Sequence, residues 1–167
     1  MTRFWRIRVG NEDVVRSCIN DGCIAVGWGE IDDLCNRDDI WLKNEIRDWY
    51  TSPQSLGNAI RQIRDFCDSN IDDEIILYNS GSICAVGKVK GPYYHKESLE
   101  YRGWGDYISN DIGFYNKKKV DWDIVFDPYL RVRYLDLPRR IINKLNTMPT
   151  ILEVFADEWI DIQSVIL

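Results

Sequence analysis

The sequence has a single histidine, His95, and no pair of cysteines in a Cys-x-x-Cys spacing. Catalysis by a Ser-His-Asp or Cys-His arrangement needs an imidazole held by an orienting group, and the polar surroundings of His95 predict an exposed loop instead. A zinc site needs clustered cysteine and histidine ligands, and none are clustered here. The sequence therefore supports neither a histidine-dependent hydrolase nor a metal centre, and we expect no cofactor.

Long apolar runs are also missing. Because no stretch of 18 apolar residues occurs, we expect no membrane-spanning helix and no membrane partner. The first residues contain no apolar core of a secretory signal. The five cysteines are an odd set, which argues against a disulfide framework and favours buried thiols in a reducing cytoplasm. These are Cys18, Cys23, Cys35, Cys67 and Cys84.

The aromatic content is high. The chain has 167 residues, of which 45% are hydrophobic, enough for the core of one folded domain over residues 1–167. Seven tryptophans and nine tyrosines are more than core packing needs in a chain of this length. We therefore expect some of these rings to form a binding surface.

The hydrophobic pattern predicts an α+β fold. Alternating apolar residues predict strands over 4–9, 23–27, 74–78, 82–90, 119–126, 130–134 and 151–155. Helical spacing and capping residues predict helices after Asn11, from Asp38 to Tyr50, after Ser52, after Asp136, and over 157–165. Residues 93–116 show no clean period and are expected to form a long loop. The order of elements favours a strongly curved mixed β-sheet or partial barrel of about six to seven strands, flanked by helices.

Two tryptophans stand between glycines, in Gly27-Trp28-Gly29 and Gly103-Trp104-Gly105. Such a ring presents a flat face that backbone can approach closely. Two of them can sandwich a planar ligand such as a base, with about 1–3 kcal/mol per stacked base. The alternative is that each ring covers an end of the sheet. Trp5, Trp49 and Trp122 lie within periodic elements and are expected in the core.

Charge is unevenly distributed although the total is −6. Residues 76–149 contain 12 lysines and arginines against 8 acidic residues, whereas the remainder of the chain is acidic. Basic residues interleaved with aromatic ones are typical of a surface that follows phosphates and stacks bases. The alternative is an ordinary solvated face. The candidate phosphate-binding residues are Lys88, Lys90, Arg102, Lys117, Lys118 and Lys119.

Several stretches resemble a known family. Residues 76–92, from Ile76 through Asn79-Ser80-Gly81 to Gly91-Pro92, resemble the central hairpin of YTH domains, which read N6-methyladenine. Val120 to Phe126 and Leu135 to Pro138 are similar to the tryptophan-bearing strand and the helix start of that family. Cys23 to Leu34 resembles the N-terminal sensor domain of McrB-type modification-dependent restriction systems, to which EVE domains are related. All of these belong to the PUA-like superfamily.

The resemblance implies a PUA-like fold with a pocket that takes a flipped base. It implies a DNA sensor for N6-methyladenine or modified cytosine that is not itself an enzyme. A GTPase motor or nuclease of the restriction system is then expected in another chain or region. The implied base-binding residues are Trp28, Asn79, Ser80, Trp104 and Asn11, with Tyr93, Tyr94, Tyr101 or Tyr107 as replacements for Trp104.

Two other functions remain open at this point. One is a YTH-type reader of N6-methyladenine in RNA, which the 2′-hydroxyl would distinguish from a DNA reader. The other is a small amidohydrolase of the related ASCH type that acts on modified nucleosides, with Lys88 or Lys90 and Glu30 as candidate groups.

Overall fold

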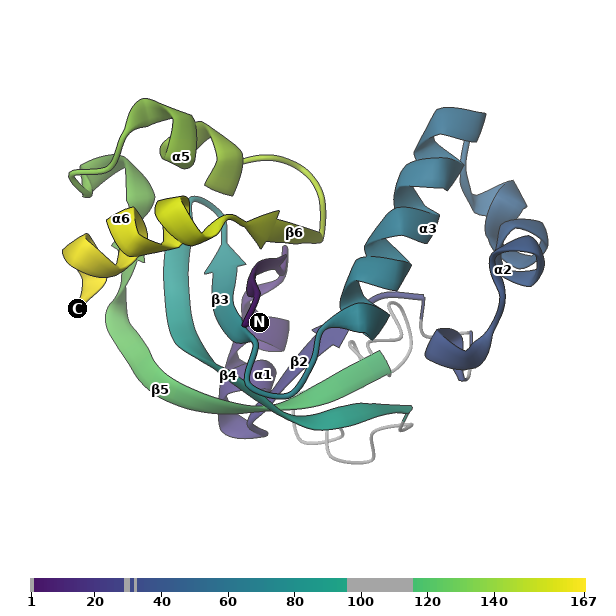
Figure 1. The fold of residues 1–167 in the computed structure, drawn as a ribbon, viewed down its shortest axis with the longest axis horizontal. Coiled ribbons are helices and arrows are strands. Elements are labelled where there is room, and N and C mark those ends of the chain that lie inside the picture. The colour runs from purple at the N-terminus through teal and green to yellow at the C-terminus, as the bar shows by residue number, and fades with distance from the viewer. Residues whose placement is uncertain (1, 29–30, 32, 96–115) are drawn as a thin grey trace.

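A curved mixed sheet forms the centre of the molecule (Figure 1). The computed structural model describes residues 2–28, 31, 33–95 and 116–167. In this part of the chain the strands follow the order β2-β5-β4-β3-β1-β6. Strand β1 pairs with β3 in parallel, and every other described pair is antiparallel. The strands are β1 (Phe4–Arg8), β2 (Cys23–Val26), β3 (Glu74–Asn79), β4 (Ser82–His95), β5 (Asn116–Arg131) and β6 (Ile151–Val154).

The described helices lie around this sheet. They are α1 (Glu12–Asn20), α2 (Asp39–Ile46), α3 (Pro53–Asp68), α5 (Arg139–Leu145) and α6 (Ala156–Ile166), with 3₁₀ turns η1 (Leu34–Asn36), η2 (Arg47–Trp49) and η4 (Val132–Tyr134). Asn11 caps α1, because its side chain accepts a hydrogen bond from the Asp13 amide at 2.8 Å. Ser52 caps α3, which begins with Pro53. None of the helices described is long and apolar enough to cross a membrane.

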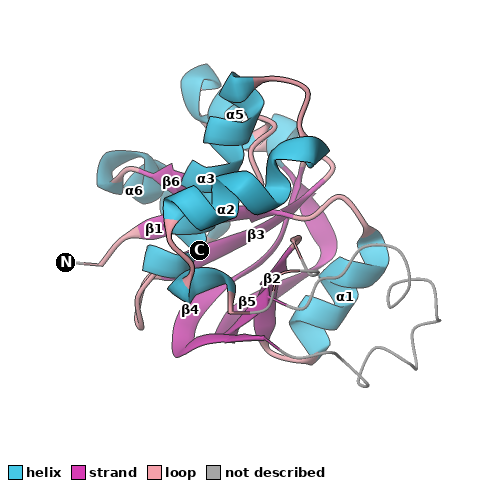
Figure 2. Ribbon diagram, turned by 90° about the vertical axis from the view of Figure 1, so that its right-hand side faces the viewer, coloured by secondary structure: helices cyan, strands magenta, loops and turns pink. Residues whose placement is uncertain are grey.

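Helices cover both faces of the sheet because side chains alternate along each strand. On β3, Ile75 and Leu77 pack with α1 in one core, while Ile76 and Tyr78 pack with α5 and α6 in another. Figure 2 shows α1 beside the sheet at the end formed by β2 and β5. The two long strands β4 and β5 curve along their length (Figure 1), so the sheet is a half-barrel.

Helices α2 and α3 form a third core with η1. A disulfide between Cys35 and Cys67 joins η1 to the last turn of α3. The prediction that all five cysteines are buried thiols is therefore wrong for this pair, because the fold brings two residues 32 positions apart into contact. Cys18, Cys23 and Cys84 are buried thiols outside this disulfide, as predicted.

The predicted fold class is confirmed, and three local predictions are corrected. Residues 119–126 and 130–134 are not two strands, because β5 continues to Arg131 and Val132 begins η4. Asp136 does not cap α5, whose N-cap position is Pro138 with no side-chain hydrogen bond. Trp49 is not a core residue, since it is 45% exposed at the end of η2.

Candidate nucleic-acid interface

A bulge in β5 builds the wall of a pocket. Ile83 of β4 pairs with Leu130, and Ala85 pairs with Val125. One β4 residue, Cys84, therefore faces four β5 residues, 126–129, and the extra length leaves the regular ladder. Such bulges redirect side chains away from the sheet. Here they open a cavity of about 510 Å³ towards α1.

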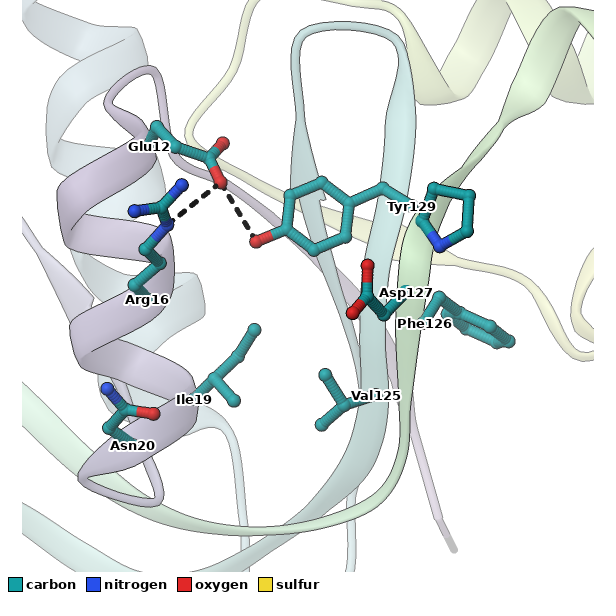
Figure 3. A pocket seen from close by; sticks show the side chains of 9 residues that line it. Glu12, Arg16, Ile19, Asn20, Val125, Phe126, Asp127 and Tyr129 are labelled. Atoms are coloured by element: carbon teal, nitrogen blue, oxygen red, sulfur yellow. Dashed lines mark hydrogen bonds and ion pairs between the residues drawn. The ribbon is translucent and has the colours of Figure 1, made fainter.

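Helix α1 supplies the opposite wall. Its lining residues are Glu12, Arg16, Ile19 and Asn20, spaced so that they share one face of the helix. Figure 3 shows this face turned towards the bulge of β5. We call the cavity the α1–β5 pocket; its other lining residues are Val125, Phe126, Asp127, Pro128 and Tyr129. A volume of this size suits a small planar ligand.

The Glu12 carboxylate is the central polar group of the pocket. Its Oε1 accepts a hydrogen bond from the Tyr129 hydroxyl at 3.0 Å, and its Oε2 accepts one from the Asn79 amide at 3.0 Å. Arg16 Nε lies 3.5 Å from Oε1, one helical turn along α1 (Figure 3). Because a carboxylate has about four acceptor positions, this arrangement fixes its orientation and leaves capacity for a ligand donor.

The Tyr129 hydroxyl keeps its proton. Burial and, to a lesser extent, the hydrogen bond to Glu12 together raise its pKa to about 12. The hydroxyl therefore donates to the carboxylate at neutral pH. The pocket thus offers a ligand an oriented acceptor beside apolar and aromatic surface, a combination that suits a base carrying an exocyclic N–H.

Three residues predicted to bind a base lie near this pocket, where their side chains position Glu12 or one another. Asn79 is buried and donates its amide to Glu12. The Ser80 hydroxyl donates to Asn79 Oδ1 at 2.9 Å, which turns the amide N–H towards the carboxylate. Asn11 uses its side chain to cap α1 and so sets the position of Glu12. Their side chains thus bond to other groups of the protein, and their contact with a base stays a prediction.

Trp28 lies in a separate group of side chains. We call the group the Trp28 cluster; it consists of Trp28, Tyr50, Tyr93 and Asn116. The Trp28 indole N–H donates to the Tyr50 hydroxyl at 2.9 Å, and the ring packs between two apolar cores. Its backbone has a φ of +60°, the left-handed region that a non-glycine residue adopts at some cost.

Side chains from two strands hold that backbone conformation. Asn116 Nδ2 donates to the carbonyls of Gly27 and Trp28 at 3.1 and 2.9 Å. The Tyr93 hydroxyl donates to Asn116 Oδ1 at 2.8 Å and accepts from the Leu34 amide at 2.9 Å. The polar atoms of Tyr93 and Asn116 are therefore used within the protein.

The two groups lie at different ends of β5. Asn116 begins the strand and Val125 begins the bulge, so about 30 Å of extended strand lies between them. Tyr94, which pairs with Lys117, is half-buried at the Trp28 end. Trp104, Tyr101, Tyr107 and Arg102, which the sequence analysis also selected, lie outside the described residues, as does Glu30.

Two of the predicted phosphate-binding lysines are inside the protein. Lys117 and Lys118 are 1% and 3% exposed, because β5 is covered on both faces at this point. Lys118 Nζ donates to the Cys67 carbonyl and to Ser69 at the end of α3. Burial lowers its pKa to about 8 despite the nearby Asp68 and Asp73. Neither lysine is placed to contact phosphate from outside.

The remaining lysines have different positions. Lys119 and Lys90 are exposed, Lys88 is half-buried, and Lys90 forms an ion pair with Asp72 at 3.3 Å. Among the described residues, the cation that lines the α1–β5 pocket is an arginine that the sequence analysis did not select. Arg16 is 58% exposed on the pocket wall, and Arg131 is exposed two residues after Tyr129.

The sequence contained signals for the pocket. Glu12, Arg16, Ile19 and Asn20 follow the helical spacing that places side chains on one face. Pro128 interrupts an alternating strand, and proline within a strand is typical of a bulge. Neither signal specifies that the helix face and the bulge meet.

Comparison with solved structures finds YTH domains. The YTH domain of Zygosaccharomyces rouxii MRB1, described in complex with N6-methyladenosine RNA, is 17% identical, with a TM-score of 0.53 over 98% of this chain and 85% of that one. The Pho92 YTH domain in complex with m6A is 18% identical, with a TM-score of 0.52 over 98% and 82%. The Mmi1 YTH domain is 11% identical, with a TM-score of 0.50 over 98% and 86%. The chain therefore has a YTH-like fold.

Two further comparisons concern sequence. No curated protein matches the chain. A model of a protein family, described as a domain of unknown function, matches residues 5–144, which include β2 to β5 and both walls of the α1–β5 pocket. The chain belongs to this family, DUF8426.

Proposed function

We propose that the protein is a non-catalytic module that binds nucleic acid and reads a modified base held in the α1–β5 pocket. The observation that carries the proposal is the Glu12 carboxylate, held by Tyr129 and Asn79 in a pocket of about 510 Å³ that both apolar and polar side chains line. The YTH-like fold supports it, because relatives of that fold are described in complexes with N6-methyladenosine RNA. Binding alone needs no catalytic group.

Different groups in the pocket would recognise different parts of the modified base. The carboxylate accepts a hydrogen bond from the exocyclic N–H of N6-methyladenine or of a modified cytosine. The methyl group adds little hydrogen bonding and is recognised by apolar surface such as Ile19 and Val125. Phe126 and Tyr129 offer aromatic surface for stacking. Extrusion of a base costs a few kcal/mol, which stacking and phosphate contacts offset.

The proposed ligand is DNA, and the proposed role is the sensor of a modification-dependent restriction system of the McrB type, with a GTPase motor or nuclease in another chain or region. The resemblance of Cys23 to Leu34 to such sensors motivates this choice. The net charge of −6 predicts weak binding to plain duplex, which suits a sensor that ignores unmodified DNA.

Fluorescence polarisation tests the proposal. Labelled oligonucleotides of one sequence are compared at low ionic strength as plain duplex DNA, duplexes with N6-methyladenine or 5-methylcytosine, and methylated RNA. We expect one modified DNA to bind roughly tenfold or more tightly than plain duplex, because stacking and methyl contacts act only on the extruded base. Equal binding of all DNAs would contradict the proposal, and a preference for the RNA would favour the RNA reader.

Substitution of Glu12 connects this preference to the pocket. Glu12→Gln keeps the size of the side chain but removes its charge and one acceptor oxygen, so the preference for the modified base is expected to fall. Glu45→Gln, on the exposed face of α2, is the matched control and should leave it unchanged. If Glu12→Gln keeps the full preference for the modified base, the carboxylate does not recognise that base.

A further inference from the structure

The loop between α5 and β6 carries an exposed methionine. Residues 146–150 connect the two elements, and Met148 is 80% exposed. Single apolar side chains at a surface are ordinary and carry no conclusion by themselves. The backbone on either side of Met148, however, is held by two arginines from β1.

Arg6 holds the loop from inside the protein. It is fully buried, and its guanidinium donates to the Pro149 carbonyl at 2.7 Å and to the Thr147 carbonyl and hydroxyl at 3.1 and 3.3 Å. Burying a guanidinium is costly unless it is well hydrogen-bonded. The fold thus uses a buried cation to fix a short surface loop.

Arg8 holds the same loop nearer the surface. Its Nη1 lies 3.3 and 3.5 Å from the carbonyls of Thr147 and Met148 and 3.2 Å from the Met148 sulfur. Together the two arginines contact three consecutive carbonyls around one exposed side chain. Met148 is therefore presented on a fixed backbone.

This loop and the α1–β5 pocket lie at the same end of the sheet. Strand β1 ends at Arg8, and the chain then reaches the Asn11 cap and Glu12 within four residues. On the neighbouring strand, the Tyr78 hydroxyl contacts Asn146 of the loop, and Asn79 donates to Glu12. Two adjacent residues of β3 thus connect the loop and the pocket.

A base that leaves a duplex also leaves a gap in the stack. DNA-binding proteins that distort the duplex insert apolar side chains between base steps, and methionine is one of the residues used. Its unbranched, polarisable side chain adapts to an irregular space. Arg8 at the base of the loop supplies positive charge beside the phosphates.

We propose that Met148 enters duplex DNA from the α5–β6 loop and fills the space left by the base that the α1–β5 pocket has taken. This proposal rests on the proposed function, because it requires an extruded base. Met148 would then contact the duplex, while the α1–β5 pocket contacts the extruded base.

Met148→Ala and Met148→Leu test the proposal on two ligands, the methylated duplex and the same methylated strand alone. Met148→Ala should weaken binding to the duplex roughly tenfold, since the gap is no longer filled. It should leave binding to the single strand unchanged, because no stack has to be opened. Met148→Leu should bind both ligands as the natural protein does. Ile160→Ala, which removes another exposed apolar side chain on α6, is the control.

A fluorescent base gives a second measurement. With 2-aminopurine next to the methylated base, the natural protein and Met148→Leu should increase its emission as the stack opens, and Met148→Ala should increase it less. Equal duplex binding by Met148→Ala, or equal loss on both ligands, would overturn the proposal. A natural protein with no methyl preference on either ligand would instead overturn the proposed function, and this proposal with it.

Discussion

The Trp28 cluster and the α1–β5 pocket differ in how their polar atoms are used. In the Trp28 cluster the indole N–H, the Tyr93 hydroxyl and the Asn116 amide all bond to other parts of the chain. In the pocket the Glu12 carboxylate is oriented by two donors while its surroundings stay open to an external ligand. The first arrangement stabilises a strained backbone, and the second suits recognition.

Under the proposed function, the residues that are conspicuous in the sequence are not the ones that bind the base. A tryptophan between glycines draws attention in the sequence, yet Trp28 joins two cores. The pocket consists of ordinary residues brought together by a helix face and a bulge. The following predictions separate the two regions, from the largest expected effect to the smallest.

Val125→Trp should have the largest effect on binding. Val125 is 46% exposed on the pocket wall, so a larger ring there occupies the pocket without disturbing a buried core. We expect the preference for modified DNA to disappear and the melting temperature to stay close to that of the natural protein. Titration with modified and plain duplex, beside a thermal melt, measures both. A retained preference would place the base elsewhere.

Trp28→Ala should lower the stability of the protein and leave its preference for modified DNA unchanged. Removing the ring takes apolar contacts from two cores and leaves the Tyr50 hydroxyl without its donor, so we expect unfolding to become easier by roughly 3 kcal/mol. Denaturation by urea measures this loss. The folded fraction should still prefer modified DNA. Loss of the preference at unchanged stability would return Trp28 to the binding site.

The pH dependence of stability should reveal Lys118 on the Trp28 side. Its pKa is lowered by burial to about 8, from an ordinary value of 10.5 that the unfolded chain retains. Between these values the unfolded chain binds more protons, so stability rises with pH across this window and is lost as pH falls through it. The buried thiols of Cys18 and Cys84, whose pKa values are raised, change stability in the opposite direction over the same range. The contribution of Lys118 is therefore the difference between two proteins: in urea denaturation, the change in stability from pH 8 to pH 10 should be less favourable in Lys118→Met than in the natural protein. The same change in stability in the variant and the natural protein would contradict the assignment.

Tyr129→Phe should have the smallest effect. It removes one donor from Glu12, which costs on the order of 1 kcal/mol of stability, and it weakens the preference for the modified base without abolishing it. Absorbance titration should also lose one tyrosine that ionises near pH 12. Tyr134→Phe, at a residue that is 72% exposed, is the control. If neither binding nor titration changes, the Tyr129 hydroxyl does not orient the Glu12 carboxylate.

The sequence predicted the fold but did not indicate the α1–β5 pocket. Alternation over residues 4–9 and 74–78 and the caps Asn11 and Ser52 are local signals, and the structure contains each of them. The pocket depends on the register between Cys84 and residues 126–129 and on the approach of α1, which no local pattern determines. For the same reason Lys118 resembled a surface lysine, although packing places it beneath α3.

The most direct test of the central claim locates the base on the protein. A methylated oligonucleotide is added to the ¹⁵N-labelled chain, and the amide resonances are followed by NMR. The base in the α1–β5 pocket should shift the amides of Ile19, Asn20 and Tyr129 more than those of Gly27 and Trp28, and plain oligonucleotide should not produce this pattern. Shifts confined to Gly27 and Trp28 would contradict the account.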